Sequence, residues 1–333
     1  MMYCDMAQEW LLLVQTVFIP TVFLGVLVVG LILNLLSLWI FFTRVKPWNR
    51  STLFLCNLAL ADVTWLLMLP FLIQYHLGQL DWIFGEAVCK LNRTVYHSCF
   101  YCSIYFITCV SVDRYLAIVH PLKSISLLTR RQSLLVCLAV WVITSVVSYP
   151  VAQMATTQTC PNNRTICSLY VFLNNTHESL PFSLTCTVTG CLGPFCAICY
   201  CYCSSVRQLR RQPHLSRWSQ KRRKLANVMY STLLIFGVLY LPYHLIRNTA
   251  IALQAAYPGV LSPPILSAET AFAFEMAFCS LNTCINPLFY FLTGGDFRHH
   301  FFEMFPCLSG RLMLRQRPPG QNVQLHVGII GPV

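Results

Sequence analysis

The sequence predicts an all-α membrane protein, a bundle of seven transmembrane helices followed by a short amphipathic helix at the membrane interface. Of its 333 residues, 56% are hydrophobic and only 10% are charged, whereas soluble proteins carry about 25% charged residues. The hydrophobic residues fall into seven stretches, each long enough for the roughly 20 residues that a helix needs to cross a bilayer. The stretches lack the alternating pattern of barrel strands, and a helix satisfies its own backbone hydrogen bonds in lipid.

The charged residues mark the limits of the seven spans in chain order. The expected spans cover residues 11–43, 51–80, 94–112, 132–163, 179–206, 225–246 and 267–295. Membrane helices tolerate proline as a kink, and six prolines lie within or near the ends of these spans: Pro20, Pro70, Pro150, Pro194, Pro242 and Pro287.

The chain after the last span divides into a helix and a tail. Residues 294–306 are predicted to form a helix that lies in the membrane interface. Its apolar face is formed by Phe297, Phe301, Phe302, Met304 and Phe305, which have helical spacing. Residues 307–333 are rich in Gly, Pro and Gln and are expected to be disordered. Cys307, just beyond the helix, is a candidate for palmitoylation, with an unmodified cysteine as the alternative. Residues 1–10 precede the seven-helix domain of residues 11–293 as a short N-terminus.

The distribution of Lys and Arg predicts the orientation in the membrane. Of 23 such residues, only Lys90, Arg93, Arg164 and Arg247 fall on the side that faces the N-terminus. Because cytoplasmic loops carry the excess of positive charge, the N-terminus is expected outside the cell and the tail inside. The net charge of +12 then reflects topology and contact with anionic lipid, and binding to a nucleic-acid polymer is not expected.

Cysteines on the outer side predict a disulfide. Cys89 opens the third span, and Cys160 and Cys167 lie in the outer loop after the fourth span, a location where disulfides persist. We expect Cys89 to form a bridge to this loop, with Cys167 as the favoured partner. Spacing does not decide whether Cys160 pairs with Cys4 or stays free.

The same outer loop carries two acceptor motifs for N-glycosylation, at Asn163 and Asn174.

A run of cysteines in the fifth span resembles a metal site and comprises Cys196, Cys199, Cys201 and Cys203. It lacks clustered histidines and lies in an apolar helix. These cysteines are expected to be small buried apolar side chains.

Polar residues within the spans are the candidate functional residues, because they are costly to insert into a bilayer. Asp62 costs roughly 2.5–3.5 kcal/mol at a helix centre and is expected to face the bundle interior. Ser103, Asn282 and Asn286 have the right chemistry to surround it together with a sodium ion. The alternative is a purely structural hydrogen-bonded hub. No other metal and no organic cofactor are expected.

Seven short motifs occur in a fixed order along the spans. They are Asn34; Asp62 at the end of Asn57-Leu-Ala-Leu-Ala-Asp; Asp113-Arg114-Tyr115; Trp141; Pro194; Pro242; and Asn286-Pro287-Leu288-Phe289-Tyr290. Together they resemble the rhodopsin-like G-protein-coupled receptors over about residues 11–305. The resemblance implies a plasma-membrane receptor with a ligand pocket in its outer half. It further implies an inner half that opens to a heterotrimeric G protein and to arrestin.

The resemblance also assigns roles in activation. Ile104, Pro194 and Phe236 would form a switch, and Arg114, Tyr202 and Tyr290 would rearrange. While the receptor is inactive, Asp113 would hold Arg114. No constellation of nucleophile, base and metal ligands is present, so the chain is not expected to be an enzyme. A scavenger or scaffold receptor that engages no G protein is the rival interpretation, against which the intact Asp113-Arg114-Tyr115 argues.

Two positions depart from the family pattern. Tyr240 stands in the sixth span where many members have Trp, so the aromatic switch is altered but still aromatic. Arg222 stands where an acidic residue often restrains Arg114. That restraint cannot form, and the sequence therefore predicts appreciable basal signalling.

Basic residues near the outer ends of two spans indicate the ligand class. Arg93 lies four residues before His97, next to Tyr96, and His244 lies three residues before Arg247, so each pair shares a helix face. Two inward guanidinium groups suit carboxylate or phosphate. The alternative is that each arginine extends to the lipid headgroups.

This constellation is similar to the receptor branch that holds the purinergic nucleotide, succinate and oxoglutarate receptors. That branch commonly has a third basic residue in the seventh span, where this chain has Met276 beside Glu275. A nucleotide or a small organic acid is the expected ligand, and a lipid-derived acid or a peptide is the alternative. In an alternative arrangement, Glu275 pairs with Arg247 and neutralises it, or binds a cationic group.

Overall fold

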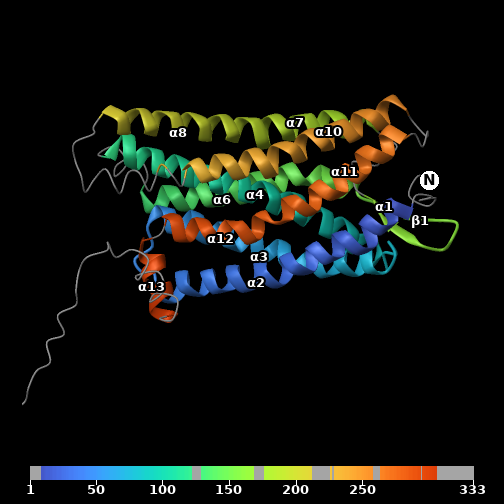
Figure 1. Ribbon diagram of the computed structural model, residues 1–333, viewed down its shortest axis with the longest axis horizontal. Coiled ribbons are helices and arrows are strands. Elements are labelled where there is room, and N and C mark those ends of the chain that lie inside the picture. Colours follow the sequence, from blue (N-terminus) through green and yellow to red (C-terminus); the bar gives the residue numbers. More distant parts are fainter. Residues whose placement is uncertain are drawn as a thin grey trace, which may run out of the picture.

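The computed structural model describes residues 9–121, 129–168, 176–211, 226, 229–257, 263–293 and 295–305. These residues form a bundle of long helices lying side by side, with a β-hairpin at one end and helix α13 at the other (Figure 1). We refer to these as the hairpin end and the α13 end. Within the described ranges, six helices are long and apolar enough to cross a membrane: Trp10–Thr43, Arg50–Leu77, Gly85–Val119, Arg130–Met154, Glu178–Arg211 and Met229–Ala256.

The seventh span is built from two helices, α11 (Pro263–Ser280) and α12 (Asn282–Thr293), which are separated at Leu281. With it, the predicted seven-helix bundle is confirmed. The second to fourth spans are the continuous helices α3 (Arg50–Leu77), α4 (Gly85–Val119) and α6 (Arg130–Met154). Helix α4 is much longer than the expected 94–112, because its end turns carry charged residues that a hydrophobic window excludes.

The first, fifth and sixth spans each contain one widened turn of π-helix. The segments are α1 (Glu9–Leu13), η1 (Val14–Phe18) and α2 (Ile19–Thr43); α7 (Thr176–Thr187), η3 (Val188–Leu192) and α8 (Gly193–Arg211); and η4 (Phe236–Tyr240) and α10 (Leu241–Ala256). Each widened turn ends two residues before a proline, namely Pro20, Pro194 or Pro242. Proline has no N–H to donate and clashes with the preceding turn, so the widened turn accommodates it without unpaired backbone groups in lipid.

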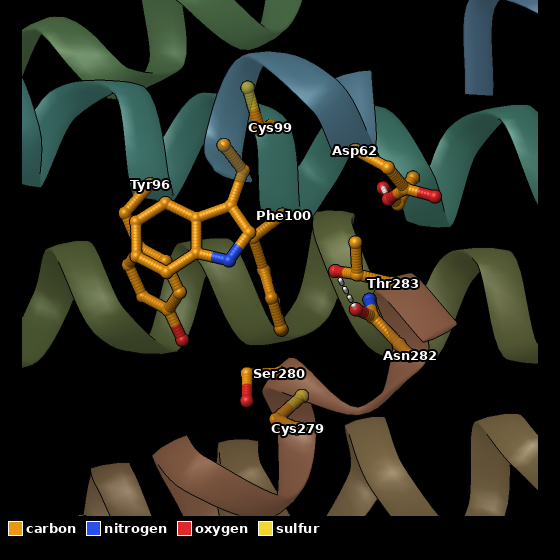
Figure 2. Close-up of a pocket in the computed structure, with 10 residues that line it drawn as sticks. Asp62, Tyr96, Cys99, Phe100, Cys279, Ser280, Asn282 and Thr283 are labelled. Carbon is orange, nitrogen blue, oxygen red and sulfur yellow. Dashed lines mark hydrogen bonds between the residues drawn. The ribbon is translucent and has the colours of Figure 1, made fainter. Parts of the chain in front are cut away.

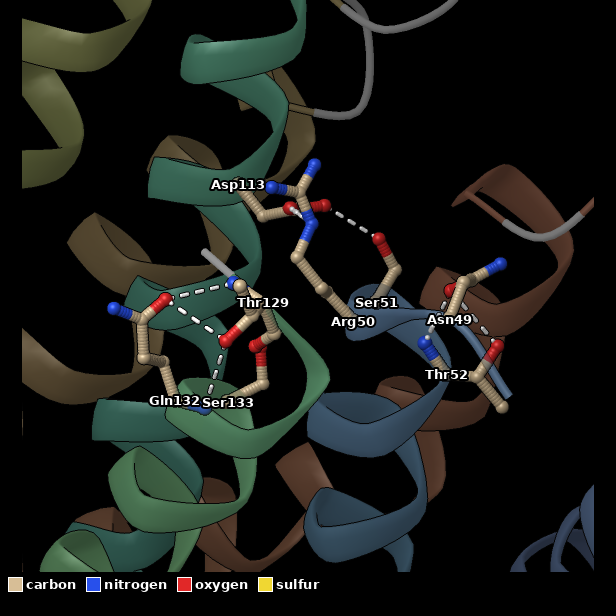
Figure 3. Close-up of polar contacts among 8 residues, drawn as sticks. All are labelled: Asn49, Arg50, Ser51, Thr52, Asp113, Thr129, Gln132 and Ser133. Carbon is tan, nitrogen blue, oxygen red and sulfur yellow. Dashed lines mark hydrogen bonds and ion pairs between the residues drawn. The ribbon is translucent and has the colours of Figure 1, made fainter. Parts of the chain in front are cut away.

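Side-chain caps fix two helix starts at the α13 end. Asn49 Oδ1 accepts a hydrogen bond from the Thr52 backbone N–H over 2.9 Å at the start of α3. Thr129 and Gln132 form a reciprocal capping box at the start of α6. Figure 3 shows both caps close to Asp113 of helix α4.

The hairpin end is held by a disulfide and by polar contacts. Strands β1 (Thr157–Thr159) and β2 (Thr165–Cys167) pair antiparallel, and Cys167 is bonded to Cys89, with Cα atoms 5.7 Å apart. The predicted Cys89–Cys167 bridge is therefore confirmed. Asp81 Oδ1 accepts a hydrogen bond from the Thr165 N–H over 2.8 Å, so the turn before α4 also holds the loop. Cys160 is itself disulfide-bonded.

Helix α13 (Gly295–Met304) lies where the sequence predicts the interfacial helix. The buried ring of Phe297 contacts Phe41 of α2 at 5.2 Å and Tyr290 of α12 at 5.8 Å between ring centroids. On its exposed face, the hydrogen bond with His300 keeps the pKa of Glu303 below its ordinary value.

Two motif residues join distant helices. Asn34 Nδ2 donates to the Thr283 carbonyl over 3.0 Å and so joins the first span to the seventh. Trp141 Nε1 donates to Asn57 Oδ1 over 3.0 Å and joins the fourth span to the second.

Candidate functional site

Arg247 lies at the centre of a buried polar network towards the hairpin end. Its side chain is fully buried. Nε donates to Ser183 Oγ over 2.9 Å, and Nη1 donates to the Tyr101 hydroxyl over 3.1 Å. Nη2 lies 3.0 Å from His244 Nδ1 and 3.3 Å from Thr187 Oγ1. The third, fifth and sixth spans thus meet around one guanidinium group, and these partners are all uncharged.

The two candidate histidines differ in their surroundings. His244 Nδ1 faces Arg247, and its Nε2 has no hydrogen-bond partner among the described residues. His97 is turned towards the fourth and fifth spans: its Nδ1 lies 2.8 Å from Ser148 Oγ, and its ring stacks on Phe182 at 5.7 Å. His244 therefore belongs to the Arg247 network, whereas His97 packs beside it.

Arg93 lies closer to the hairpin. Its Nη2 donates to the carbonyl oxygen of Cys167 over 2.9 Å, and its side chain is buried. Arg93 precedes Tyr101 by eight residues on α4, a rise of about 12 Å at 1.5 Å per residue. The two arginines therefore occupy separate levels, one under the hairpin and one in the bundle interior.

The seventh span contributes one carboxylate and one apolar side chain. Glu275 is half-buried, its Oε1 has no hydrogen-bond partner within the described chain, and it forms no ion pair with Arg247 there. Met276 is buried in an apolar cluster with Cys89 and Ala277. The alternative Glu275–Arg247 pair is thus not formed, because Arg247 is directed towards Ser183 of the fifth span.

A small cavity, with room for about one water molecule, lies deeper in the bundle. Figure 2 shows its lining, which comes from the second, third and seventh spans: Asp62, Trp65, Tyr96, Cys99, Phe100, Ser103, Cys279, Ser280, Asn282 and Thr283. The ring of Tyr96 contacts that of Trp65 in a tilted arrangement, with 4.7 Å between the ring centroids. The candidate residues Tyr96 and Asp62 therefore border one cavity.

Three of the four residues expected around a sodium ion line this cavity, namely Asp62, Ser103 and Asn282, and the fourth, Asn286, contacts Asp62. Asp62 Oδ2 accepts a hydrogen bond from Asn286 Nδ2 over 2.9 Å, and Oδ1 accepts one from Ser103 Oγ over 3.3 Å. Asn286 Oδ1 is buried without a hydrogen-bond partner in the described structure. Asn282 instead donates to the Tyr240 hydroxyl over 2.7 Å. A buried carboxylate, a hydroxyl and an orphaned amide oxygen fit a hard cation.

The aromatic switch residues lie between this cavity and the α13 end. Tyr240 is fully buried and contacts Phe236 at 5.1 Å between ring centroids. Phe236 stacks on Phe195 at 5.6 Å. Ile104 and Pro194 are buried as well. The hydrogen bond from Asn282 means that Tyr240 joins the sixth span to the seventh.

Asp113 does not hold its neighbour Arg114 as the sequence suggests. Asp113 Oδ1 lies 3.3 Å from Arg50 Nε, and Oδ2 accepts a hydrogen bond from Ser51 Oγ (Figure 3). Arg114 forms no ion pair within the described chain, and its buried Nε has no hydrogen-bond partner there. The expected Asp113–Arg114 pair is therefore replaced by contacts with the first turn of α3.

The remaining activation residues make aromatic contacts. Tyr115 contacts Tyr200 at 5.8 Å, and Tyr202 contacts Tyr230 at 6.2 Å. Tyr290 is fully buried, contacts Phe41 at 5.3 Å, and its hydroxyl has no partner in the part of the chain that is described. It follows Pro287 on α12.

Sequence reasoning missed the partners of the two charged centres. Ser183, Thr187 and Tyr101 surround Arg247, and Arg50 and Ser51 hold Asp113. No local signal identifies them, since most of these contacts join residues at least 60 positions apart.

Some predictions concern modification or residues outside the described ranges. Asn163 lies in an exposed turn at positive φ, and its glycosylation stays a prediction. Cys4, Asn174, Arg222, Cys307 and the tail lie outside the described residues.

Comparisons with known proteins agree with this architecture. Residues 33–290 match the family described as 7 transmembrane receptor (rhodopsin family). The chain is 31% identical to purinoceptor 1 of Mus musculus over 317 residues, which is 94% of this chain and 84% of the relative. It is 32% identical to purinoceptor 3 of Meleagris gallopavo over 311 residues, which is 92% and 93% of the two chains.

These matches agree with the motif order, the seven-helix bundle and the disulfide. They describe a multi-pass membrane receptor and not an enzyme. The chain belongs to the rhodopsin family of seven-transmembrane receptors, in the purinergic branch that contains these purinoceptors.

Proposed function

We propose that this receptor senses an extracellular anionic small molecule, a nucleotide or an organic acid, and activates a heterotrimeric G protein. The observation that carries the proposal is the buried guanidinium of Arg247, which is held by hydroxyl, carbonyl and imidazole groups. A buried positive charge in a low-dielectric interior attracts an anion strongly.

Arg93 supports the same ligand class. It lies at the hairpin level, where a ligand entering from outside meets it first. Arg93 precedes Tyr101, a partner of Arg247, by eight residues or about 12 Å of helix rise, so a ligand that engages both arginines is extended along the bundle axis. The relatives carry the name purinoceptor, and a nucleotide has this extended, anionic form.

One observation favours a second candidate, a lipid-derived acid. Met276 occupies the place in the seventh span where the branch commonly has a basic residue, and it is buried among apolar side chains. A ligand with one anionic group and an apolar body needs only one of the two arginines, Arg93 or Arg247. Its apolar body suits the apolar side chains around Met276.

The proposal includes a topology and further partners. The hairpin end faces the extracellular side of the plasma membrane, in accordance with the distribution of basic residues. The α13 end receives the G protein and, after activation, arrestin. A sodium ion held by Asp62, Ser103 and Asn286 would stabilise the inactive arrangement by supplying positive charge beside the buried carboxylate.

The test is a screen of nucleotides, carboxylic-acid metabolites and lipid acids on cells that express the receptor, read by calcium and cyclic-nucleotide responses. We expect an active anion whose potency falls at least tenfold in Arg247→Ala, because one charge-assisted contact contributes about 1.5–3 kcal/mol. Arg93→Ala is compared in the same assay.

Arg164→Ala is the matched control, because Arg164 is also an arginine at the hairpin end but its side chain is only half-buried and donates its hydrogen bonds to Gln79. An agonist that is insensitive to both Arg93→Ala and Arg247→Ala contradicts the anion site. Ligand-evoked responses that are unchanged in Arg114→Ala contradict coupling to a G protein.

A further inference from the structure

We propose that Arg50 is a positioning residue that raises agonist-free signalling: it holds Asp113 in an ion pair and so leaves Arg114 available to the G protein. The inference rests on the G-protein coupling proposed above and adds a residue that the family motifs do not include. The observation behind it is the placement of Arg50, on the first turn of α3, against the buried carboxylate of α4.

Both carboxylate oxygens of Asp113 contact residues of the second span. Arg50 Nε lies 3.3 Å from Oδ1, and Ser51 donates its hydroxyl hydrogen to Oδ2 (Figure 3). The Asp113 side chain is only 5% exposed and that of Arg50 is 22% exposed. Burial of the pair reduces screening by water and salt, so the attraction exceeds that of a surface ion pair.

The first turn of α3 is itself held in place. Asn49 caps it by accepting hydrogen bonds from the N–H and the hydroxyl of Thr52. Adjacent residues Arg50 and Ser51 are therefore presented to Asp113 from a fixed helix start. A preorganised pair of donors loses little conformational entropy when it binds the carboxylate. This favours the contacts of Asp113 with Arg50 and Ser51 over a contact with a flexible side chain.

The contacts of Asp113 with α3 leave Arg114 without an acidic partner in the described chain. The carboxylate that would restrain it is directed to Arg50, and Arg114 is half-buried with no ion pair in the described chain. Arg222 stands where an acidic restraint is often found in the sixth span, so the sequence supplies no substitute there. The active arrangement of Arg114 is then reached without first breaking an ion pair, which shifts the two-state equilibrium towards signalling.

The experiment compares agonist-free G-protein activation at matched surface expression. Arg50→Gln releases Asp113 to pair with Arg114, and we expect basal signalling to fall about fivefold, the lower end of typical coupling between two states. Arg50→Lys keeps the charge and is expected to stay within about twofold of the parent, since a single contact needs no planar fork. Arg44→Gln is the matched control: it also removes a positive charge at the α13 end, but Arg44 lies over the Trp39 ring.

The pairing itself is tested in an Asp113→Asn background, where Arg50→Gln is expected to have no further effect on basal signalling. Thermal melting of the purified full-length single and double variants provides a readout independent of signalling. We expect the two substitutions to be non-additive, because they remove the same contact.

Each outcome has one meaning. Basal signalling that is absent in the parent, or unchanged or raised in Arg50→Gln, overturns the inference. An equal fall in the Asp113→Asn background, or additive melting shifts, overturns it as well. A receptor that activates no G protein even with an agonist bound contradicts the proposed function. In that case the melting temperatures of the single and double variants still report whether Arg50 and Asp113 are coupled.

Discussion

The hydroxyl of Tyr101 accepts a hydrogen bond from Arg247 Nη1 over 3.1 Å and thereby joins the third span to the sixth. The contact is buried, and it involves the charge on which the proposed ligand site depends. Tyr101 is in turn packed against the widened turn η3 of the fifth span, where Gly190 faces its ring. Three spans thus cooperate to orient one guanidinium group.

Tyr101→Phe is predicted to reduce the potency of an anionic agonist about tenfold. The substitution keeps the ring and removes the hydroxyl, and a hydrogen bond to a charged group contributes about 1.5–3 kcal/mol. Concentration–response curves at matched surface expression measure the shift. Tyr105→Phe is the control, since that hydroxyl contacts the Thr189 carbonyl at 3.4 Å near the surface. Equal shifts for the two variants would contradict the role of Tyr101.

Gly190→Ala is predicted to destabilise the receptor by about 1–3 kcal/mol, the usual cost of overpacking. A Cβ atom at Gly190 would overlap Cε1 and Cδ1 of Tyr101, so either the ring or the fifth span must move. Thermal melting in detergent measures the loss. Gly25→Ala serves as the control, because a Cβ there meets nothing within 4 Å. The same melting temperature for both variants would show that the ring adapts freely.

Asp62→Asn is predicted to abolish stabilisation by sodium. A cation that binds only the folded receptor at ten times its Kd contributes about 1.4 kcal/mol, and the amide lacks the charge to hold it. Melting temperatures in sodium chloride and in choline chloride give the measurement. Asp81→Asn is the control, because Asp81 holds the outer loop through Thr165 and its variant should keep the sodium response. A sodium response retained in Asp62→Asn would defeat the site.

Cys167→Ser is predicted to lower the amount of folded receptor at the cell surface. Closing the loop between residues 89 and 167, a separation of 78, contributes about 4 kcal/mol on the chain-entropy model. Surface labelling of cells measures the loss, and Cys89→Ser should reproduce it without further loss in the double variant. Cys203→Ser is the control, because Cys203 is free and exposed. Additive losses in the double variant would mean that the two cysteines act separately.

The sequence determined the features that depend on local composition. The number and order of the spans follow from apolar length, because every segment that crosses lipid must be apolar and helical. The six prolines marked places where a kink was expected, since a residue without an N–H disturbs its own helix, and three of them follow a widened turn. A bridge from Cys89 to the outer loop was expected because few cysteines lie on the side where disulfides persist, and the favoured partner, Cys167, is the one that is bonded.

Tertiary structure alone decided which side chains meet inside the bundle. The adjacency of Asp113 and Arg114 suggested a pair, yet Asp113 faces Arg50 across the interface with α3. Likewise, Arg93 and Arg247 share a sign and a side of the membrane, but they occupy separate levels with separate partners. The physical reason is that hydrophobic patterning sets where a helix begins and ends, whereas its rotation and tilt against its neighbours depend on packing over the whole bundle.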